Sequence, residues 1–478
     1  MNEAGMLAPV SADATSREAL AEREAGLHRS LTSWQIAMIG LGSSIGTGLF
    51  LGSAVSVKLA GPAVILSFAG AACIALTMML ALAEMAAAHP AAGSFGLYAE
   101  MYLHPWAGFA IRLTYWLCVT AAAGGEVVAS SIYCHLWLPQ VPAWLWIALF
   151  SALILYLNTV SVASFGKFEN GFSTIKVLTI GVFLVLGSAL LLGIGFPRIG
   201  FANYTANGGF LPHGWTGVGL GVVMGLFSFF GIEVAGGAAG EAANPKVAVP
   251  RALRRTLLVL VVAYVAGLAV VVGIVPWTNI GLGESPFVRV FQTAGIPAAS
   301  HIMNFVVLTA ALSSAMANLY FASRLIFSLA RGGYAPAALG RLSKKGMPVV
   351  AVLTSGTLMV VTLALLSRFQ DSLFLRMIGV STFGALFAWG VTLLTHLAFR
   401  RFHKETQKPY VRIGPSGPWF SLFGLAAVLA VLISTWWVPG FRVTLQAGLP
   451  WLAFATVCYF VWVKRPAHQS ASGESRNG

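Results

Sequence analysis

The sequence predicts an all-α protein that crosses a membrane many times, with two of its helices broken at mid-membrane. Three observations support this prediction. Of the 478 residues, 58% are hydrophobic and only 9% are charged, whereas a soluble domain carries about 25% charged residues. The mean hydropathy is +0.81, and glycine clusters interrupt two of the apolar segments. A chain this apolar has too little polar surface to face water on all sides, so we expect a bilayer to be its solvent.

Twelve segments are long and apolar enough to cross a bilayer, which takes about 20 residues of helix. The predicted spans cover residues 33–57, 62–88, 106–136, 142–160, 168–195, 216–242, 254–276, 298–330, 347–367, 375–400, 418–438 and 443–463. We expect a ten-helix core over residues 32–405 and two further spans within 406–465. The polar tails, 1–31 and 466–478, are expected to be disordered.

The basic residues indicate how the chain is oriented. Most of the 29 Lys and Arg residues fall in loops on one side of the predicted spans, including "KVAVPRALRR" and "RRFHKETQKPYVR". Cytoplasmic loops carry such an excess of positive charge. We therefore expect both termini to be cytoplasmic, and we attribute the net charge of +14 to membrane orientation rather than to nucleic-acid binding.

The first and sixth spans contain the two interruptions. The first reads "IGLGSSIGTGLF" over residues 39–50, and the sixth reads "GLFSFFGIEVAGGAAGEAANP" over 225–245. Each glycine weakens a helix by about 1 kcal/mol relative to alanine. The breaks lie five spans apart, and consecutive halves with an odd number of spans have opposite orientation. The pattern predicts a five-plus-five inverted repeat with a binding site at the broken helices.

A helix break at mid-membrane leaves backbone N–H and C=O groups without partners, and lipid cannot satisfy them. The N–H groups at the start of a half-helix suit a carboxylate, and the carbonyls at the end of the other half suit an ammonium. A zwitterion of amino-acid size would satisfy both sets. The alternative for the first span is a close-packing face, because Gly42 and Gly46, and Gly48 and Gly52, fit the small-xxx-small pattern.

Three ionisable residues lie deep in predicted spans, where a charge costs at least about 2.5–3.5 kcal/mol. Glu126 is expected to line the cavity and to face the substrate or take a proton; the alternative is a structural hydrogen-bond acceptor. Lys176 could protonate reversibly, because burial lowers the pKa of a lysine, or could be structural. Glu233 lies in the sixth-span break, where its carboxylate could cap the N–H groups of the second half-helix.

Other polar residues in the spans are expected to be structural. Glu84 lies near the inner end of the second span, and Arg112 is expected to reach the membrane interface. His396 is expected to be a packing or interface residue. The four cysteines, Cys73, Cys118, Cys134 and Cys458, show no metal-ligand spacing, so we expect neither a metal nor a cofactor.

Several motifs resemble those of bacterial amino-acid permeases of the amino acid–polyamine–organocation superfamily. They are "IGLGSSIGTGLFLGSA", "ALAEMAAAHPAAGSFGLYAEMY", "FSFFGIEVAGGAAGEAANPKVAVPRAL" and "SSAMANLYFASRLIFSLARGGYAPAAL". The resemblance runs from about residue 32 to 405. It implies the five-plus-five fold, a place in the bacterial inner membrane, and amino-acid transport that is commonly coupled to protons.

The resemblance also implies residue roles. Amides of Gly46, Thr47 and Gly48 would hold the substrate carboxylate, and carbonyls of Ser44, Phe227 and Phe230 would hold the ammonium. Glu233 would act in gating or proton coupling, and Lys176 would occupy the place of a coupling cation. The predicted substrate-binding set is Ser44, Ile45, Gly46, Thr47, Gly48, Glu126, Phe227, Phe230 and Asn318.

The function expected from these features is proton-coupled amino-acid import by alternating access. Exchange of amino acids without net proton movement is the alternative. An enzyme would need catalytic side chains that converge near one membrane face, and the sequence shows no such set. A channel would need a continuous polar lining, which two local breaks in twelve spans do not supply.

Overall fold

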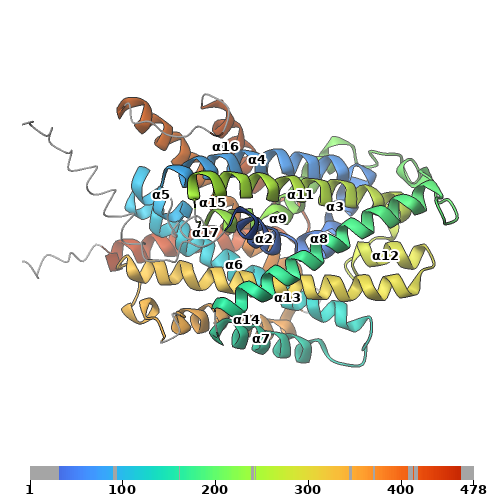
Figure 1. Cartoon of the computed structure of the whole chain (residues 1–478), viewed down its shortest axis with the longest axis horizontal. Helices are drawn as coiled ribbons and strands as arrows, with labels where there is room; N and C mark the ends of the chain where they lie inside the picture. The colour runs from blue at the N-terminus through green and yellow to red at the C-terminus, as the bar shows by residue number, and fades with distance from the viewer. Residues whose placement is uncertain are drawn as a thin grey trace, which may run out of the picture.

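The computed structural model describes residues 32–89, 94–160, 162–237, 242, 244–343, 347–369, 372–406, 413 and 418–463. Within these ranges every regular element is a helix, which confirms the all-α prediction. Long helices lie side by side along the longest axis of the molecule, and short helices lie toward its ends (Figure 1). The two predicted tails, 1–31 and 466–478, lie outside the described residues.

Each predicted span coincides with one helix or with a pair of consecutive helices. Nine of the described helical stretches are long and apolar enough to cross a membrane, and two shorter apolar helices accompany them. The count of twelve spans and the inverted repeat stay predictions. The principal helices are α2 (Ser33–Ser44), α3 (Ser53–Ala60), α4 (Val64–Ala88), α5 (Ser94–Tyr102), α6 (Pro105–His135), α7 (Ala143–Val160), α8 (Val162–Leu192), α9 (Gly214–Phe229), α10 (Ile232–Gly237), α11 (Pro245–Ile274), α12 (Pro286–Thr293), α13 (Pro297–Arg331), α14 (Val349–Phe369), α15 (Leu373–Thr406), α16 (Trp419–Ser434) and α17 (Val443–Cys458).

Helix α6 forms the centre of the molecule and packs most extensively against α13 and α15. In its most apolar segment 89% of the residues are buried, compared with 33% in α8 and α14 and 22% in α17. The outer helices therefore present apolar side chains such as Leu178, Val185 and Val457 to their surroundings. This is the arrangement expected where lipid replaces water around the protein.

The predicted break in the first span is confirmed. Helix α2 ends at Ser44, and Ile45 leaves the helical region with φ −82° and ψ 88°. The chain then resumes in a π-helical turn over Gly48–Gly52 and continues as α3. π-Helical turns are rare and lie frequently at functional sites.

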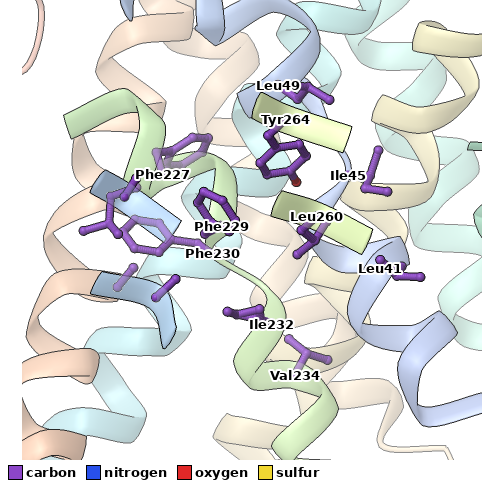
Figure 2. Close-up of a cluster of buried hydrophobic side chains, with 14 of the residues drawn as sticks. Leu41, Ile45, Leu49, Phe227, Phe229, Phe230, Ile232, Val234, Leu260 and Tyr264 are labelled. Carbon is purple, nitrogen blue, oxygen red and sulfur yellow. The ribbon is translucent and has the colours of Figure 1, made fainter. Parts of the chain in front are cut away.

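The predicted break in the sixth span is also confirmed. Helix α9 ends at Phe229, Phe230 is extended with φ −62° and ψ 144°, and α10 begins at Ile232. Gly231 has φ +104°, a conformation that glycine adopts without a steric penalty. Figure 2 shows the ribbon losing its coil between Phe230 and Ile232.

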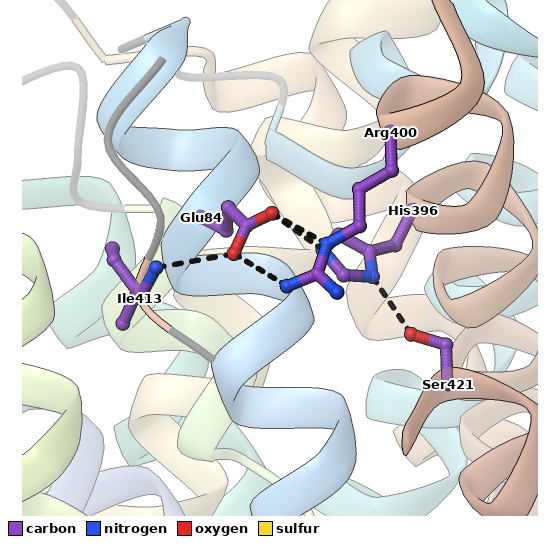
Figure 3. Close-up of polar contacts among 5 residues, drawn as sticks. All are labelled: Glu84, His396, Arg400, Ile413 and Ser421. Carbon is purple, nitrogen blue, oxygen red and sulfur yellow. Dashed lines mark hydrogen bonds and ion pairs between the residues drawn. The ribbon is translucent and has the colours of Figure 1, made fainter. Parts of the chain in front are cut away.

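A buried ionic cluster at Glu84, which we call the Glu84 junction, joins α4 to α15 and to the start of α16 (Figure 3). The Glu84 carboxylate accepts hydrogen bonds from Arg400 at 2.7 and 2.9 Å, from His396 at 3.1 Å and from the Ile413 amide at 3.1 Å. Nδ1 of His396 lies 2.7 Å from Oγ of Ser421. His396, expected to be a packing or interface residue, is thus a hydrogen-bonded bridge between helices.

The prediction that Arg112 reaches the membrane interface is wrong. Its side chain does not extend to the surface of the protein: it is fully buried and forms an ion pair with Glu100 at 2.8 Å. The hydroxyl of Tyr334 donates to the other carboxylate oxygen at 2.8 Å. The short helix α5, which hydropathy does not reveal, packs against α6 and supplies the counter-charge that makes burial of Arg112 tolerable.

Candidate functional site between the two broken spans

A small cavity lies between the broken spans and is bordered by five of the predicted spans. Its lining combines polar groups from α6, α13 and α15 with backbone from both breaks. The lining residues are Ser43, Ser44, Gly46, Gly48, Tyr115, Cys118, Val119, Ala122, Glu126, Phe227, Phe230, Gly231, Ser314, Asn318 and Ser381.

Most of the predicted substrate-binding set borders this cavity. From that set the lining includes Ser44, Gly46, Gly48, Glu126, Phe227, Phe230 and Asn318. Ile45 and Thr47 are not among the lining residues, and the side chain of Ile45 is fully buried. The predicted coupling residues, Lys176 and Glu233, also lie behind the cavity wall, where both are buried.

The first-span break receives a carboxylate from α6. The amide of Thr47 points at Glu126 and lies 3.3 Å from Oε1 and 3.2 Å from Oε2. Gly46 permits this close approach, since a Cβ at that position would lie 2.4 Å from the carboxylate and 2.7 Å from Oγ of Ser314. A carboxylate of the protein thus accepts from the amide that the family resemblance assigned to the substrate carboxylate.

The carbonyls at the end of α2 also have side-chain partners. The ammonium of Lys176 donates to the Gly42 carbonyl at 2.8 Å. The hydroxyl of Tyr264 lies 2.9 Å from the carbonyl oxygen of Ser44 and 2.8 Å from that of Ser228. Because one hydroxyl has one proton, the two carbonyls share it, and Tyr264 connects the two spans. Figure 2 shows the ring of Tyr264 between Phe229 and Ile45.

Glu233 lies at the sixth-span break. Its carboxylate accepts a hydrogen bond from the Gly231 amide at 3.1 Å and another from the hydroxyl of Tyr115. The contact with the Gly231 amide is of the kind that the capping interpretation describes, whereas the contact with Tyr115 joins the break to α6. The gating or proton-coupling role of Glu233 stays a prediction.

Aromatic rings close one side of the cavity. Phe227 and Phe230 pack edge to face with centroids 5.7 Å apart, and Phe230 packs in the same way on Trp389 at 5.1 Å. The lining also contains polar side chains, among them Glu126, Ser314 and Asn318. Such a cavity suits a small solute that has both a polar and an apolar part. Among the described residues, no group of three or more His, Cys, Asp or Glu side chains is placed to hold a metal ion.

Sequence reasoning did not find Tyr264, Tyr115, Cys118 and Ser381. Tyr264 stands in the apolar run "VVAYVAGL", where a tyrosine is an ordinary core residue, and only the fold shows that its hydroxyl meets both breaks. Ser314 lies one helical turn before Asn318 on α13, and Asn318 was the one residue of this helix that the sequence assigned to the site.

The fold and the cavity together define a polytopic membrane protein with two interrupted helices around a small cavity, the arrangement of many secondary transporters. Comparison with known proteins identifies the group. The family model "Amino acid permease" matches residues 35–471, and the chain belongs to this family.

Individual relatives are similar over nearly their whole length. The uncharacterized amino acid permease YtnA of Bacillus subtilis is 36% identical over 438 residues, which cover 91% of this chain and 95% of the relative. The gamma-aminobutyric acid permease of Bacillus subtilis is 35% identical over 455 residues, covering 94% and 97%. The aromatic amino acid transport protein AroP of Escherichia coli K12 is 36% identical over 438 residues, covering 91% and 95%.

Proposed function

We propose that this protein imports amino acids across the bacterial inner membrane by alternating access, coupled to protons, with both termini in the cytoplasm. The observation that carries the proposal is the meeting of two broken helices at one cavity that contains a carboxylate, hydroxyls and aromatic rings. The names of the relatives, a gamma-aminobutyric acid permease and an aromatic amino acid transport protein, support a substrate that carries both an amino group and a carboxylate.

The proposed binding mode follows from the backbone groups at the breaks. The substrate carboxylate would bind the amides of Thr47 and Gly48, and the ammonium would bind carbonyls at Ser44, Phe227 and Phe230. The rings of Phe227 and Phe230 border the cavity and would contact the substrate side chain, and Asn318 would contact its polar part.

The test of this proposal is uptake by proteoliposomes that contain the purified protein. Each of the twenty amino acids is offered with and without an inward proton gradient. We expect accumulation of a subset of amino acids that increases when the gradient is imposed. Failure of every amino acid to accumulate, together with normal folding in detergent, would contradict the proposal.

Lys176 is the proposed coupling residue, because its ammonium is buried and binds the Gly42 carbonyl beside the first break. Replacement by alanine removes this cation and leaves the carbonyl without it. We expect K176A to lose at least about 90% of gradient-driven uptake, a tenfold effect that corresponds to about 1.4 kcal/mol. Gradient-driven uptake at the wild-type rate would remove Lys176 from the coupling mechanism.

Exchange without net proton movement is the second candidate, and the same contact favours it. An ammonium held permanently on Gly42 fills the place of a coupling cation without having to titrate. Uptake into liposomes that were preloaded with amino acid, and none into empty liposomes at any pH gradient, would identify an exchanger.

A further inference from the structure

Side chains of this protein satisfy the backbone groups that the two helix breaks release. We propose that one of them, Glu126, is a displaceable internal ligand that takes the place of the substrate carboxylate. The Glu126 carboxylate binds the Thr47 amide and withdraws when an amino acid binds, so that binding is an exchange of one carboxylate for another. This inference rests on the proposed function and specifies which group the substrate replaces.

The exchange follows from the geometry at Thr47. Both oxygens of Glu126 lie within 3.3 Å of the single Thr47 N–H, so a second carboxylate cannot bind there at the same time. Two carboxylates at this distance would also repel each other strongly in a buried site. Either Glu126 or the substrate can be the acceptor, but not both.

Glu126 is the partner that is placed to be displaced. The side chains of Lys176, Tyr264 and Glu233 satisfy backbone groups from behind the cavity wall, whereas Glu126 borders the cavity itself. A helical side chain leans toward the N-terminal end of its helix, which directs Glu126 over Ala122. Ala122 also lines the cavity and carries only a methyl group, so we expect the withdrawn carboxylate to lie over it.

The surroundings of Glu126 form a receptor for any carboxylate at this position. The hydroxyl of Ser314 from α13 hydrogen-bonds the Glu126 carboxylate and lies 3.4 Å from the Ser43 carbonyl, and the positive charge of Lys176 from α8 acts on Glu126. Tyr133 and Tyr264 are neighbours of Glu126, and the charge of Glu126 acts on their hydroxyls. When Glu126 withdraws, the Thr47 amide and the Ser314 hydroxyl become donors for the incoming carboxylate, and Lys176 supplies the same counter-charge.

The substrate class follows from this exchange. Only a ligand with its own carboxylate can replace Glu126 and leave the Thr47 amide with a charged acceptor. An amine or an ester of the same amino acid brings no charged acceptor, so Glu126 stays on the Thr47 amide when such an analogue binds. The substrate carboxylate must compete with Glu126 for the Thr47 amide. The preference of the wild type for an amino acid over its carboxylate-free analogue should therefore be smaller than the Thr47 and Ser314 donors alone would give.

The experiment compares two ligands on two proteins in detergent. The ligands are the amino acid that is transported best in the panel above and the methyl ester of that amino acid, which keeps the ammonium and the side chain. The proteins are the wild type and E126Q, in which a neutral amide replaces the competing charge. The quantity measured is the ratio of the dissociation constant of the ester to that of the amino acid.

We expect this ratio to be about tenfold higher in E126Q than in the wild type, since a hydrogen bond to a charged acceptor is worth more than one to a neutral acceptor. An unchanged or lower ratio would overturn the inference, because loss of a structural acceptor or of an ammonium partner weakens both ligands together. If E126Q fails to fold, E126D provides the second test. It keeps the charge but withdraws it by one methylene, and the ratio should again rise, by less. Absence of any amino-acid binding to the wild type would refute the proposed function instead.

Discussion

Replacement of Gly231 by alanine is expected to abolish uptake and to destabilise the protein. Gly231 has φ +104°, where an L side chain is strained by about 1–3 kcal/mol. A Cβ there would also lie 2.8 Å from the backbone carbon of Ser43, and backbone cannot move aside as a flexible side chain can. The alanine would push the two breaks apart, so we expect at least about a tenfold loss of uptake, equivalent to about 1.4 kcal/mol.

The matched control for this variant is G219A. Gly219 lies in the same span, in α9, and a Cβ there would meet nothing within 4 Å. Alanine favours a helix over glycine by up to about 1 kcal/mol, so G219A should retain uptake and stability. Equal uptake by G231A and G219A in proteoliposomes would show that the close contact of the breaks is not required.

The second large effect is expected at the Glu84 junction. Replacement of Arg400 by alanine leaves the fully buried carboxylate of Glu84 without its two guanidinium hydrogen bonds (Figure 3). Removal of one partner of a buried ion pair costs about 3–5 kcal/mol. We therefore expect R400A to unfold at a clearly lower temperature than the wild type, as measured by the fluorescence of the detergent-purified protein.

The adjacent arginine provides the control. Arg401 pairs with Glu405 at 2.9 Å, but its side chain is 81% exposed, and exposed pairs contribute about 0–1 kcal/mol. R401A should unfold close to the wild-type temperature. If R400A and R401A have the same unfolding temperature, the Glu84 junction does not hold α4 and α15 together.

The helices and both breaks could be predicted from the sequence because each depends on local composition. A run of about 20 apolar residues requires a helix in lipid, and glycine at Gly46 and Gly231 marks the places where that helix ends. The short helices α5 and α12 could not be predicted in the same way, because neither is long enough to give a hydropathy signal. Without α5 and its Glu100, the burial of Arg112 could not be foreseen.

The candidate site, too, could be predicted from the sequence only where a residue stands out locally. Glu126 stood out because a charge in an apolar span needs a reason, and the structure places it at the cavity. Its contact with Thr47 depends on how α6 packs beside the first break, which no local pattern encodes. The same holds for Tyr264, whose hydroxyl meets two carbonyls from spans that are far apart in the sequence.

The most direct test is a crystal or cryo-electron-microscopy structure of the protein with its amino acid bound. We expect the ligand to lie between the two breaks, with its carboxylate within about 3 Å of the Thr47 amide and with Glu126 turned away from that amide. An amino acid bound elsewhere, with Glu126 still on Thr47, would contradict the claim that the broken backbone is the binding site.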